Sequence, residues 1–149
     1  MKISPKLAEI AGIHAGDGHL RKNGKEFELS GGFEEKEYYD NHVIPLFNSV
    51  FSIEVKGKFF LTKGTYGIRT SNSHIKNTLA SLGFPYGRKN TIVHVPEDIL
   101  YNNTEIKIAF LRGLFDTDGS ISFDKKIKNF DLFKKNRHYY PRVSFSTTS

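Results

Sequence analysis

The sequence predicts an α+β fold with one complete lobe (residues 1–84), a linker (residues 85–103) and a partial second lobe (residues 104–149). Two helical segments that share one pattern begin the two lobes. After the first segment, strand-like and helical spacings alternate, whereas only two strands can be placed after the second. We therefore expect an αββαββα lobe with a mixed or antiparallel sheet, packed on a partial copy of itself through the two similar helices.

Composition narrows the possible partners. The chain has 149 residues, a formal net charge of +6 and a pI near 9.4, which favours nucleic acid over a membrane surface. Residues 120–149 carry seven Lys or Arg against two Asp, with aromatic side chains interleaved. No apolar run is long enough to span a membrane, and no cysteine is present for disulfides or thiolate zinc sites. We expect a cytoplasmic protein with no membrane partner.

An internal repeat organises the chain. Residues 8–20 read AEIAGIHAGDGHL and residues 109–121 read AFLRGLFDTDGSI. At a constant offset of 101 residues, Ala8 matches Ala109, Gly12 matches Gly113, Asp17 matches Asp118 and Gly18 matches Gly119. Ser4 and Pro5 are suited to begin the first helix, and Thr104 is the expected cap of the second.

Small residues four apart mark one face of each helix. The two sets are Ala8, Gly12 and Gly16, and Ala109, Gly113 and Thr117. Glycine inside a helix costs about 1 kcal/mol, so a close approach of two backbones is expected to offset that cost. We expect the two stripes to pack against each other about a local two-fold axis.

This packing would bring Asp17 and Asp118 together at the helix C-termini. Helix ends there are partially negative and two carboxylates repel each other, so a divalent cation would relieve both effects. Mg²⁺ prefers oxygen and commonly uses one or two carboxylates with phosphate and water. Gly18 and Gly119 would allow the sharp exit into a strand. The alternative interpretation is that Asp-Gly only marks a turn.

The remaining elements follow from turn residues and periodicity. Residues 19–33 predict a hairpin turning at Asn23-Gly24, and residues 34–51 a helix broken or kinked at Pro45. Residues 53–63 and 65–71 predict a second hairpin, and residues 74–82 a helix that ends at Gly83. In the second lobe only strands 120–126 and 142–148 are expected.

The stretches IAGIHAGDG (residues 10–18) and LRGLFDTDG (residues 111–119) resemble the paired signature of LAGLIDADG homing endonucleases. The resemblance implies a saddle-shaped sheet in the DNA major groove and hydrolysis of double-stranded DNA during intron or intein homing. It also implies catalysis with Mg²⁺, for which Mn²⁺ or Ca²⁺ can substitute in binding.

Residue roles carried over from the resemblance are expectations. Asp17 and Asp118 would be catalytic metal ligands, with the backbone carbonyls of Gly16 and Thr117 as co-ligands. An earlier motif acid falls on Ala15 in the first copy and Asp116 in the second. A catalytic basic residue is expected before the second motif helix, with Lys89 the candidate and Arg88 and His94 its rivals. The water-orienting polar position falls on Phe33 or Glu34 and stays unassigned.

DNA contacts are expected on the hairpin strands. Alternation would put Lys56 and Lys58 on one face, Arg21 and Asn23 on one face, and Arg69 across from them. The full set of candidates is Arg21, Asn23, Lys25, Lys56, Lys58, Arg69, Lys125 and Arg142. The alternative interpretation for each is a solvated strand side chain.

Other functions stay open. A cleavage-inactive relative could bind intron RNA as a maturase, or DNA as a regulator, and a plain structural α/β domain is a further alternative. An intein endonuclease domain would need flanking self-splicing segments, which this sequence does not contain. Because the second lobe is incomplete, the alternatives for the chain are a fragment, a split enzyme or a decayed gene product, and dimerisation, element exchange or a partner could complete the sheet. We expect weak or no cleavage by the isolated monomer.

Overall fold

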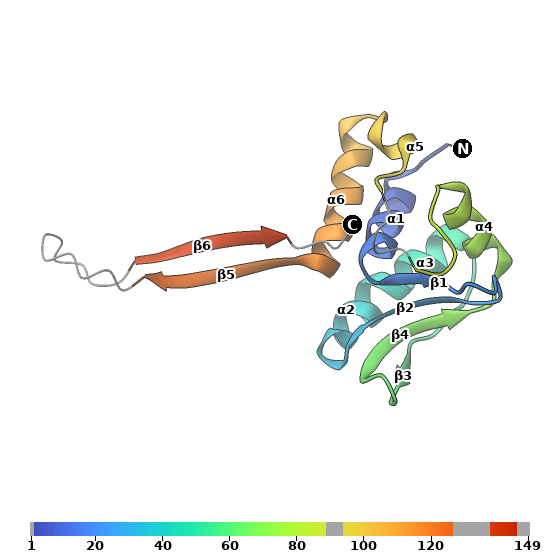
Figure 1. The fold of residues 1–149 in the computed structure, drawn as a ribbon, viewed down its shortest axis with the longest axis horizontal. Coiled ribbons are helices and arrows are strands. Elements are labelled where there is room, and N and C mark those ends of the chain that lie inside the picture. The colour runs from blue at the N-terminus through green and yellow to red at the C-terminus, as the bar shows by residue number, and fades with distance from the viewer. Residues whose placement is uncertain (1, 89–93, 127–137, 146–149) are drawn as a thin grey trace, which may run out of the picture.

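Two helices pack side by side at the centre of the molecule, α1 (Pro5–Asp17) and α6 (Thr104–Asp118) (Figure 1). The computed structural model describes residues 2–88, 94–126 and 138–145. Helix α1 begins as predicted, because the Ser4 side chain accepts a hydrogen bond from the Leu7 N–H. The predicted cap of α6 is wrong by one residue. The side chain of Asn103, not Thr104, accepts the Ile106 N–H, and Thr104 becomes the first helical residue.

The first lobe contains one four-stranded antiparallel sheet in the order β1-β2-β4-β3. Its strands are β1 (Gly18–Leu20), β2 (Phe27–Gly32), β3 (Lys58–Phe60) and β4 (Thr65–Thr70). Both predicted hairpins are present. Their turns contain Gly24 and Gly64, whose φ angles of 66° and 65° lie in the left-handed region that glycine adopts without strain.

A broken helical segment joins the two hairpins, as the proline predicted. It consists of a 3-10 turn, η1 (Phe33–Glu35), a helical turn, α2 (Lys36–Tyr38), a π-helix, η2 (Tyr39–Val43), and α3 (Ile44–Phe51). Pro45 is the second residue of α3, where its missing N–H and its ring are tolerated. Helix α4 (Ser73–Ser81) is capped by Asn72 and followed by Gly83 at φ 96°, which confirms the predicted final helix.

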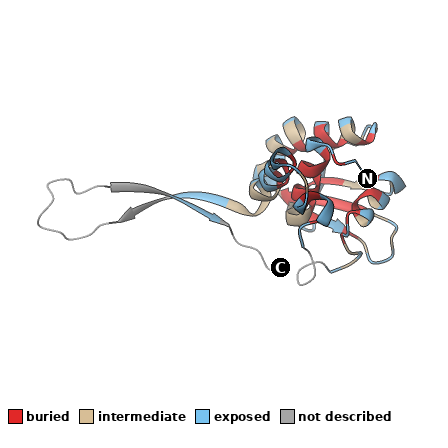
Figure 2. Cartoon of the chain, turned by 90° about the horizontal axis from the view of Figure 1, so that it is seen from above, coloured by how far each residue is buried: buried red, intermediate tan, exposed pale blue. Residues whose placement is uncertain are grey.

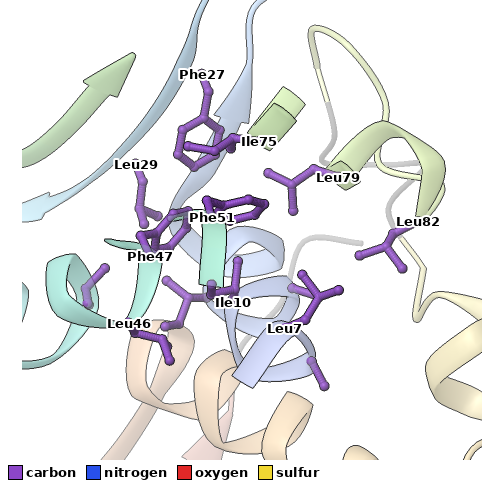
Figure 3. Packing of buried hydrophobic residues seen from close by; sticks show 14 of the residues in the cluster. Leu7, Ile10, Phe27, Leu29, Leu46, Phe47, Phe51, Ile75, Leu79 and Leu82 are labelled. Carbon is purple, nitrogen blue, oxygen red and sulfur yellow. The ribbon is translucent and has the colours of Figure 1, made fainter. Parts of the chain in front are cut away.

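The core lies between the sheet and the helices of the first lobe (Figures 2 and 3). Leu7 and Ile10 of α1 belong to the same core cluster as Phe27 and Leu29 of β2, and Phe47 of α3 stacks on Phe27 at 5.6 Å. Leu79 of α4 completes this layer. The alternation of β2 therefore turns its apolar residues toward α1 and leaves the opposite sheet face for polar side chains. Among the described residues, no helix has the length and apolarity needed to cross a membrane.

The second half projects as a ribbon from the end of α6 (Figure 1). It consists of strands β5 (Gly119–Lys126) and β6 (His138–Phe145), paired antiparallel. The predicted start of the last strand, residue 142, is too late, because pairing along β5 carries the partner strand back to His138. A short helix, α5 (Glu97–Leu100), lies within the predicted linker and packs against α6. The boundaries of the two lobes stay a prediction.

The predicted strand 53–63 is too long, since only Lys58–Phe60 joins the sheet. The Asn48 side chain explains the difference: its amide accepts the Val55 N–H at 2.9 Å and donates to the Val55 carbonyl at 3.2 Å. These bonds occupy backbone groups that a strand would use. Lys56 therefore precedes the sheet and does not share a strand face with Lys58.

The segment after β1 also differs from the prediction. Arg21 and Asn23 lie in the turn beyond Leu20, where the Arg21 N–H donates to the Glu26 carbonyl at 3.0 Å and the Gly24 N–H donates to the Arg21 carbonyl at 2.8 Å. The Asn23 side chain accepts the Lys25 N–H. The strand-face argument for Arg21 and Asn23 is therefore wrong, because turn geometry and not alternation sets their directions.

Candidate metal site and nucleic-acid interface

In the contact between α1 and α6, a glycine of each helix packs against a backbone carbonyl of the other. A Cβ added at Gly12 would overlap the Phe110 carbonyl oxygen, and one added at Gly113 would overlap the Glu9 carbonyl oxygen. Phe110 is the repeat equivalent of Glu9, so the contacts obey the predicted local two-fold relation. Ala8 and Ala109 are buried in the same packing. The close approach of backbones predicted from the small-residue stripes is confirmed.

The strands continue directly from the helix ends. Gly18 and Gly119 have φ angles of −78° and −86°, in extended backbone that any residue adopts. Their role is spatial: a side chain at Gly18 would overlap the His14 ring, and one at Gly119 would overlap Phe115. The predicted exit from helix to strand is present, but its reason is crowding and not backbone freedom.

The two motif acids lie at one end of the helix pair. A Cβ built on Gly16, the residue before Asp17, would lie 3.4 Å from the Asp118 carboxyl carbon and would overlap the Thr117 hydroxyl. The Thr117 hydroxyl donates to the carbonyls of its own helix, at 3.0 Å for Leu114 and 3.3 Å for Gly113. Only the backbone of Thr117 is thus suited to the co-ligand role that the resemblance implies.

The donor set at this end fits an open cation site and not an all-protein cage. The described residues contain no group of three or more His, Cys, Asp or Glu arranged to hold a metal. Two carboxylates with neighbouring backbone carbonyls match the way Mg²⁺ is commonly held, with water and substrate phosphate supplying further oxygens. The chemistry of Asp17 and Asp118 therefore fits a divalent cation shared with a phosphodiester.

Two tyrosines that sequence reasoning did not identify contact the motif acids. The Tyr39 hydroxyl donates to Asp17 Oδ2 at 3.3 Å, and the Tyr38 hydroxyl donates to Asp116 Oδ2 at 3.3 Å. Burial, followed by the charge of Asp17, raises the pKa of Tyr39 far above its ordinary value, so this hydroxyl stays a donor. The available signal was the Tyr-Tyr pair in a segment of helical spacing, but its direction depends on the π-helix η2.

A further acid, Glu9, is buried beside the helix interface. Glu9 of α1 is 7% exposed, and its Oε1 lies 2.6 Å from His42 Nε2. The His42 ring stacks on Tyr38 at 5.5 Å, and Arg112 Nη1 of α6 lies 3.9 Å from Glu9 Oε2. This chain of contacts ties η2 to both motif helices and so supports the position of the tyrosines.

The candidates for the positively charged catalytic residue are only partly described. Lys89 lies outside the described residues, so its role stays a prediction. Arg88 is exposed, and His94 lies near Gly83 at the end of α4. Phe33 and Glu34 form the 3-10 turn η1, where the Phe33 ring packs on Phe59 at 5.3 Å, so Phe33 does not offer a polar group.

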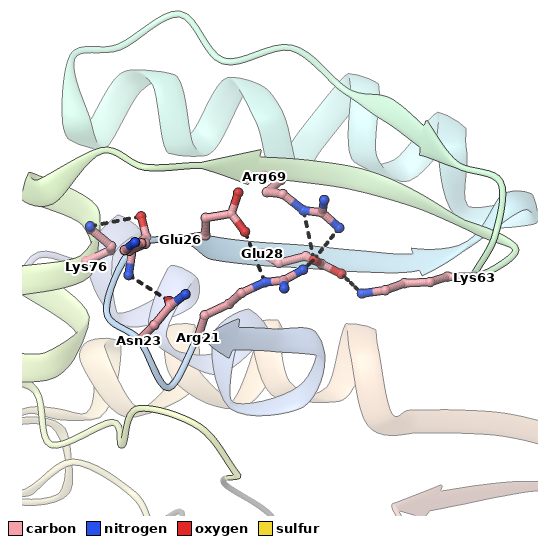
Figure 4. A network of polar contacts seen from close by, with 8 residues as sticks. Arg21, Asn23, Glu26, Glu28, Lys63, Arg69 and Lys76 are labelled. Atoms are coloured by element: carbon pink, nitrogen blue, oxygen red, sulfur yellow. Dashed lines mark hydrogen bonds and ion pairs between the residues drawn. The ribbon is translucent and has the colours of Figure 1, made fainter.

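The sheet face turned away from the helices carries a cluster of charges around one buried carboxylate (Figure 4). Glu28 of β2 has a side chain that is 7% exposed, and it receives Arg69 Nε at 3.0 Å and Nη2 at 2.8 Å. Lys63 donates to Oε1 of the same carboxylate, and Arg21 Nη2 lies 3.4 Å from Oε2. Two of the predicted DNA-contacting arginines thus converge on a single acid.

The other predicted DNA contacts are more dispersed. Lys25 and Asn23 are exposed in the first hairpin turn, where Lys76 of α4 donates to the Lys25 carbonyl at 3.1 Å. Lys58 is exposed on β3, with its ammonium 5.5 Å from the Phe60 ring centroid. Arg142 is exposed on β6, and of Lys125 the structure describes only the backbone, in β5.

Comparison with known proteins identifies the fold. Residues 105–149 match the LAGLIDADG-like domain family. A structure of mesophilic variants of the homing endonuclease I-DmoI superposes with a TM-score of 0.52 at 18% identity, covering 78% of this chain and 58% of that one. The crystal structure of I-DmoI in complex with DNA and calcium has the same TM-score at 19% identity and covers the same shares. The chain therefore has the LAGLIDADG fold, and its residues 105–149 match that family.

The chain matches segments of longer curated proteins. An uncharacterised protein of Methanocaldococcus jannaschii is 28% identical over 148 residues, which is 98% of this chain and 49% of that protein. The tRNA-splicing ligase of Methanopyrus kandleri is 30% identical over 132 residues, covering 77% of this chain and 13% of the ligase. The glutamine–fructose-6-phosphate aminotransferase of M. jannaschii is 30% identical over 128 residues, covering 83% of this chain and 11% of the enzyme. The chain thus spans about half or less of the length of these relatives.

Proposed function

We propose that this chain is a divalent-metal-dependent endonuclease that recognises and hydrolyses double-stranded DNA. The observation that carries the proposal is the pairing of Asp17 and Asp118 at one end of two helices locked by reciprocal glycine contacts. The fold it shares with I-DmoI, a homing endonuclease solved with DNA and calcium and, as a variant, with nicked target DNA and manganese, supports the same function.

The residues have distinct roles in the proposed reaction. Asp17 and Asp118, with the Gly16 and Thr117 carbonyls, would hold the cation, and Mg²⁺ is the proposed ion. When bound, it supplies Lewis-acid stabilisation of charge on the phosphate and a more acidic water. The Tyr39 hydroxyl orients the Asp17 carboxylate, and Lys89 is the proposed cation near the scissile phosphate.

Apolar side chains of the second half are exposed where their first-lobe equivalents are buried. Leu7, Ile10 and Leu20 are 7%, 0% and 1% exposed in the first lobe. Their repeat equivalents Ile108, Leu111 and Ile121 are 53%, 59% and 59% exposed. We infer that a segment equivalent to the helix and hairpin of the first lobe covers this face in the active protein, by dimerisation or through a partner, and that the isolated chain cleaves weakly.

Homing is the proposed biological context. The stretches that match this chain make up only 13% of a ligase and 11% of an aminotransferase, two enzymes of unrelated chemistry. Such a distribution supports a module that moves between genes. A maturase function on intron RNA is the second candidate, and it rests on the same basic sheet face. A cytoplasmic location stays a prediction from composition.

The first test is sequencing of cut ends from a randomised duplex library incubated with the protein and Mg²⁺. The expected result is staggered double-strand breaks at a preferred sequence, abolished by EDTA, by Asp17→Asn and by Asp118→Asn. Asp116→Asn is the matched control, because it removes a motif carboxylate from the same helix end without removing a proposed ligand.

Binding and metal readouts separate the possible failures. Selective duplex binding without breaks, unchanged in both aspartate variants, would show that recognition is retained without catalysis. Stabilisation of the fold by Ca²⁺, measured as a rise in Tm that is lost in Asp17→Asn, tests the metal site without relying on cleavage. Preferential binding of folded RNA over duplex DNA would favour the maturase alternative.

A further inference from the structure

The outer sheet face contains a buried acid at the point where a DNA-binding surface would need positive charge. Glu28 lies on the face opposite Phe27 and Leu29, which are fully buried in the core. In the sheet register it stands beside Arg69 of β4 and His19 of β1. A buried carboxylate is unfavourable unless it is paired, and the described contacts of Glu28 are all with cations.

Arg69 is fixed from two sides. Its Nε and Nη2 both donate to Glu28 Oε2, and its guanidinium carbon lies 4.6 Å from the centroid of the Phe60 ring. Phe60 is itself only 7% exposed on this outer face and does not belong to the main core cluster. An arginine normally loses side-chain entropy when it binds a ligand, and this one is already ordered by a carboxylate and a ring.

The remaining cations of the cluster are less constrained. Arg69 is 26% exposed, whereas Arg21 and Lys63 are 38% and 48% exposed. Arg21 is shared between Glu28 and the half-exposed Glu26, whose Oε2 lies 3.1 Å from Arg21 Nε. The face therefore combines one guanidinium held on two sides with two more exposed cations, and its three cations exceed its two acids by one charge.

We propose that Glu28 is a specificity-determining positioning residue, which holds Arg69 in one orientation for base-edge recognition and limits sequence-independent attraction to phosphate. The inference rests on the proposed DNA-binding function. A guanidinium with its Nε edge committed to Glu28 still has donors on the opposite edge, and guanine O6 and N7 are the acceptors that arginine reads in a major groove. A neutral residue at position 28 would free three cations for phosphate contacts, which carry no sequence information.

Charge-matched variants test this role. Glu28→Gln keeps the shape of the side chain and removes its charge, and Glu26→Gln makes the same charge change beside Arg21 without touching Arg69. Both variants are expected to bind random duplex DNA more tightly and to steepen the dependence of log K on log salt by roughly one, the effect of about one further phosphate contact. Only Glu28→Gln is expected to lose discrimination, measured as at least a tenfold smaller preference for the duplex selected by the wild type.

One further variant controls for charge, and thermal unfolding controls for folding. Arg69→Lys retains the charge but loses the two-point contact, so its discrimination should fall as in Glu28→Gln while its salt dependence stays that of the wild type. Thermal unfolding of each variant shows whether the fold persists, and selection is compared only among folded variants. If Glu28→Gln misfolds, Arg69→Lys carries the test of the same contact.

The outcomes separate this inference from the function on which it rests. If the wild type selects no duplex sequence, the proposed function fails. If the wild type selects a sequence and both Glu28→Gln and Arg69→Lys retain its preference at the level of Glu26→Gln, the role of Glu28 is overturned and DNA recognition stands. Loss of preference in Glu28→Gln and Arg69→Lys, but not in Glu26→Gln, supports it.

Discussion

The Tyr39 hydroxyl donates a hydrogen bond to Asp17 Oδ2 at 3.3 Å across 22 residues of sequence. Tyr39 is 1% exposed, and it belongs to the π-helix that links the two hairpins. The contact therefore joins the lobe core to the end of the first motif helix. An acid that would bind a cation is thus oriented by a side chain of the rigid core and not by solvent.

Tyr39→Phe tests this orientation. The expected result is a several-fold loss of cleavage rate with nearly unchanged DNA affinity and a fall in unfolding free energy of about 1 kcal/mol, because one hydrogen bond is removed from a buried group. The measurement is single-turnover cleavage with direct DNA binding. Tyr38→Phe is the control, since its hydroxyl contacts Asp116 instead. Equal losses in both variants would argue against a specific role for Tyr39.

Gly12→Ala tests the helix interface. In an exposed helix this change would stabilise by about 1 kcal/mol, because alanine is the better helix former. Here the added methyl group would overlap the Phe110 carbonyl, so we expect a loss of about 1–3 kcal/mol or failure to fold. Denaturant unfolding gives the value, and Gly113→Ala should behave alike. A raised midpoint in either variant would contradict the close packing.

Ile10 and Leu111 occupy equivalent positions of the repeat, but alanine substitution should affect stability strongly at Ile10 and little at Leu111. Ile10→Ala should lower the free energy of unfolding by about 2–5 kcal/mol, because the side chain is fully buried. Leu111→Ala, at the equivalent exposed position, should change it by less than about 0.5 kcal/mol. Denaturant unfolding of the dilute monomer measures both. A large loss at Leu111 would mean that this face is already covered in solution.

Glu28 should make the stability of the fold depend on pH. Burial opposes its ionisation, but hydrogen bonds from Lys63 and Arg69 outweigh burial and hold its pKa below the ordinary 4.5. The ionised form therefore stabilises the fold above pH 4.5, and this contribution is lost as the pH falls through the lower folded-state pKa. Tm measured against pH should fall less steeply in Glu28→Gln than in the wild type. Parallel curves would show that Glu28 does not contribute.

The order of elements and the helix pairing could be predicted because their signals are local. The repeat at an offset of 101 residues, the four-residue spacing of small side chains and the turn glycines each depend on neighbours in sequence. Strand limits were less predictable, as Asn48 shows, since its side chain removes Val55 from pairing. The residue types at positions 53–57 alone do not predict that Asn48 binds the Val55 backbone.

By itself, the sequence determined that two helices end in Asp17 and Asp118 and present matching small-residue faces. These glycine faces allow the two helix backbones to approach closely and favour packing of one face against the other. Only the tertiary structure decided that Tyr39 contacts Asp17 and that Arg69 and Lys63 converge on Glu28. Those contacts join residues 22, 41 and 35 positions apart. They exist because sheet register and a π-helical turn fix where each side chain points, and neither is encoded in a local pattern.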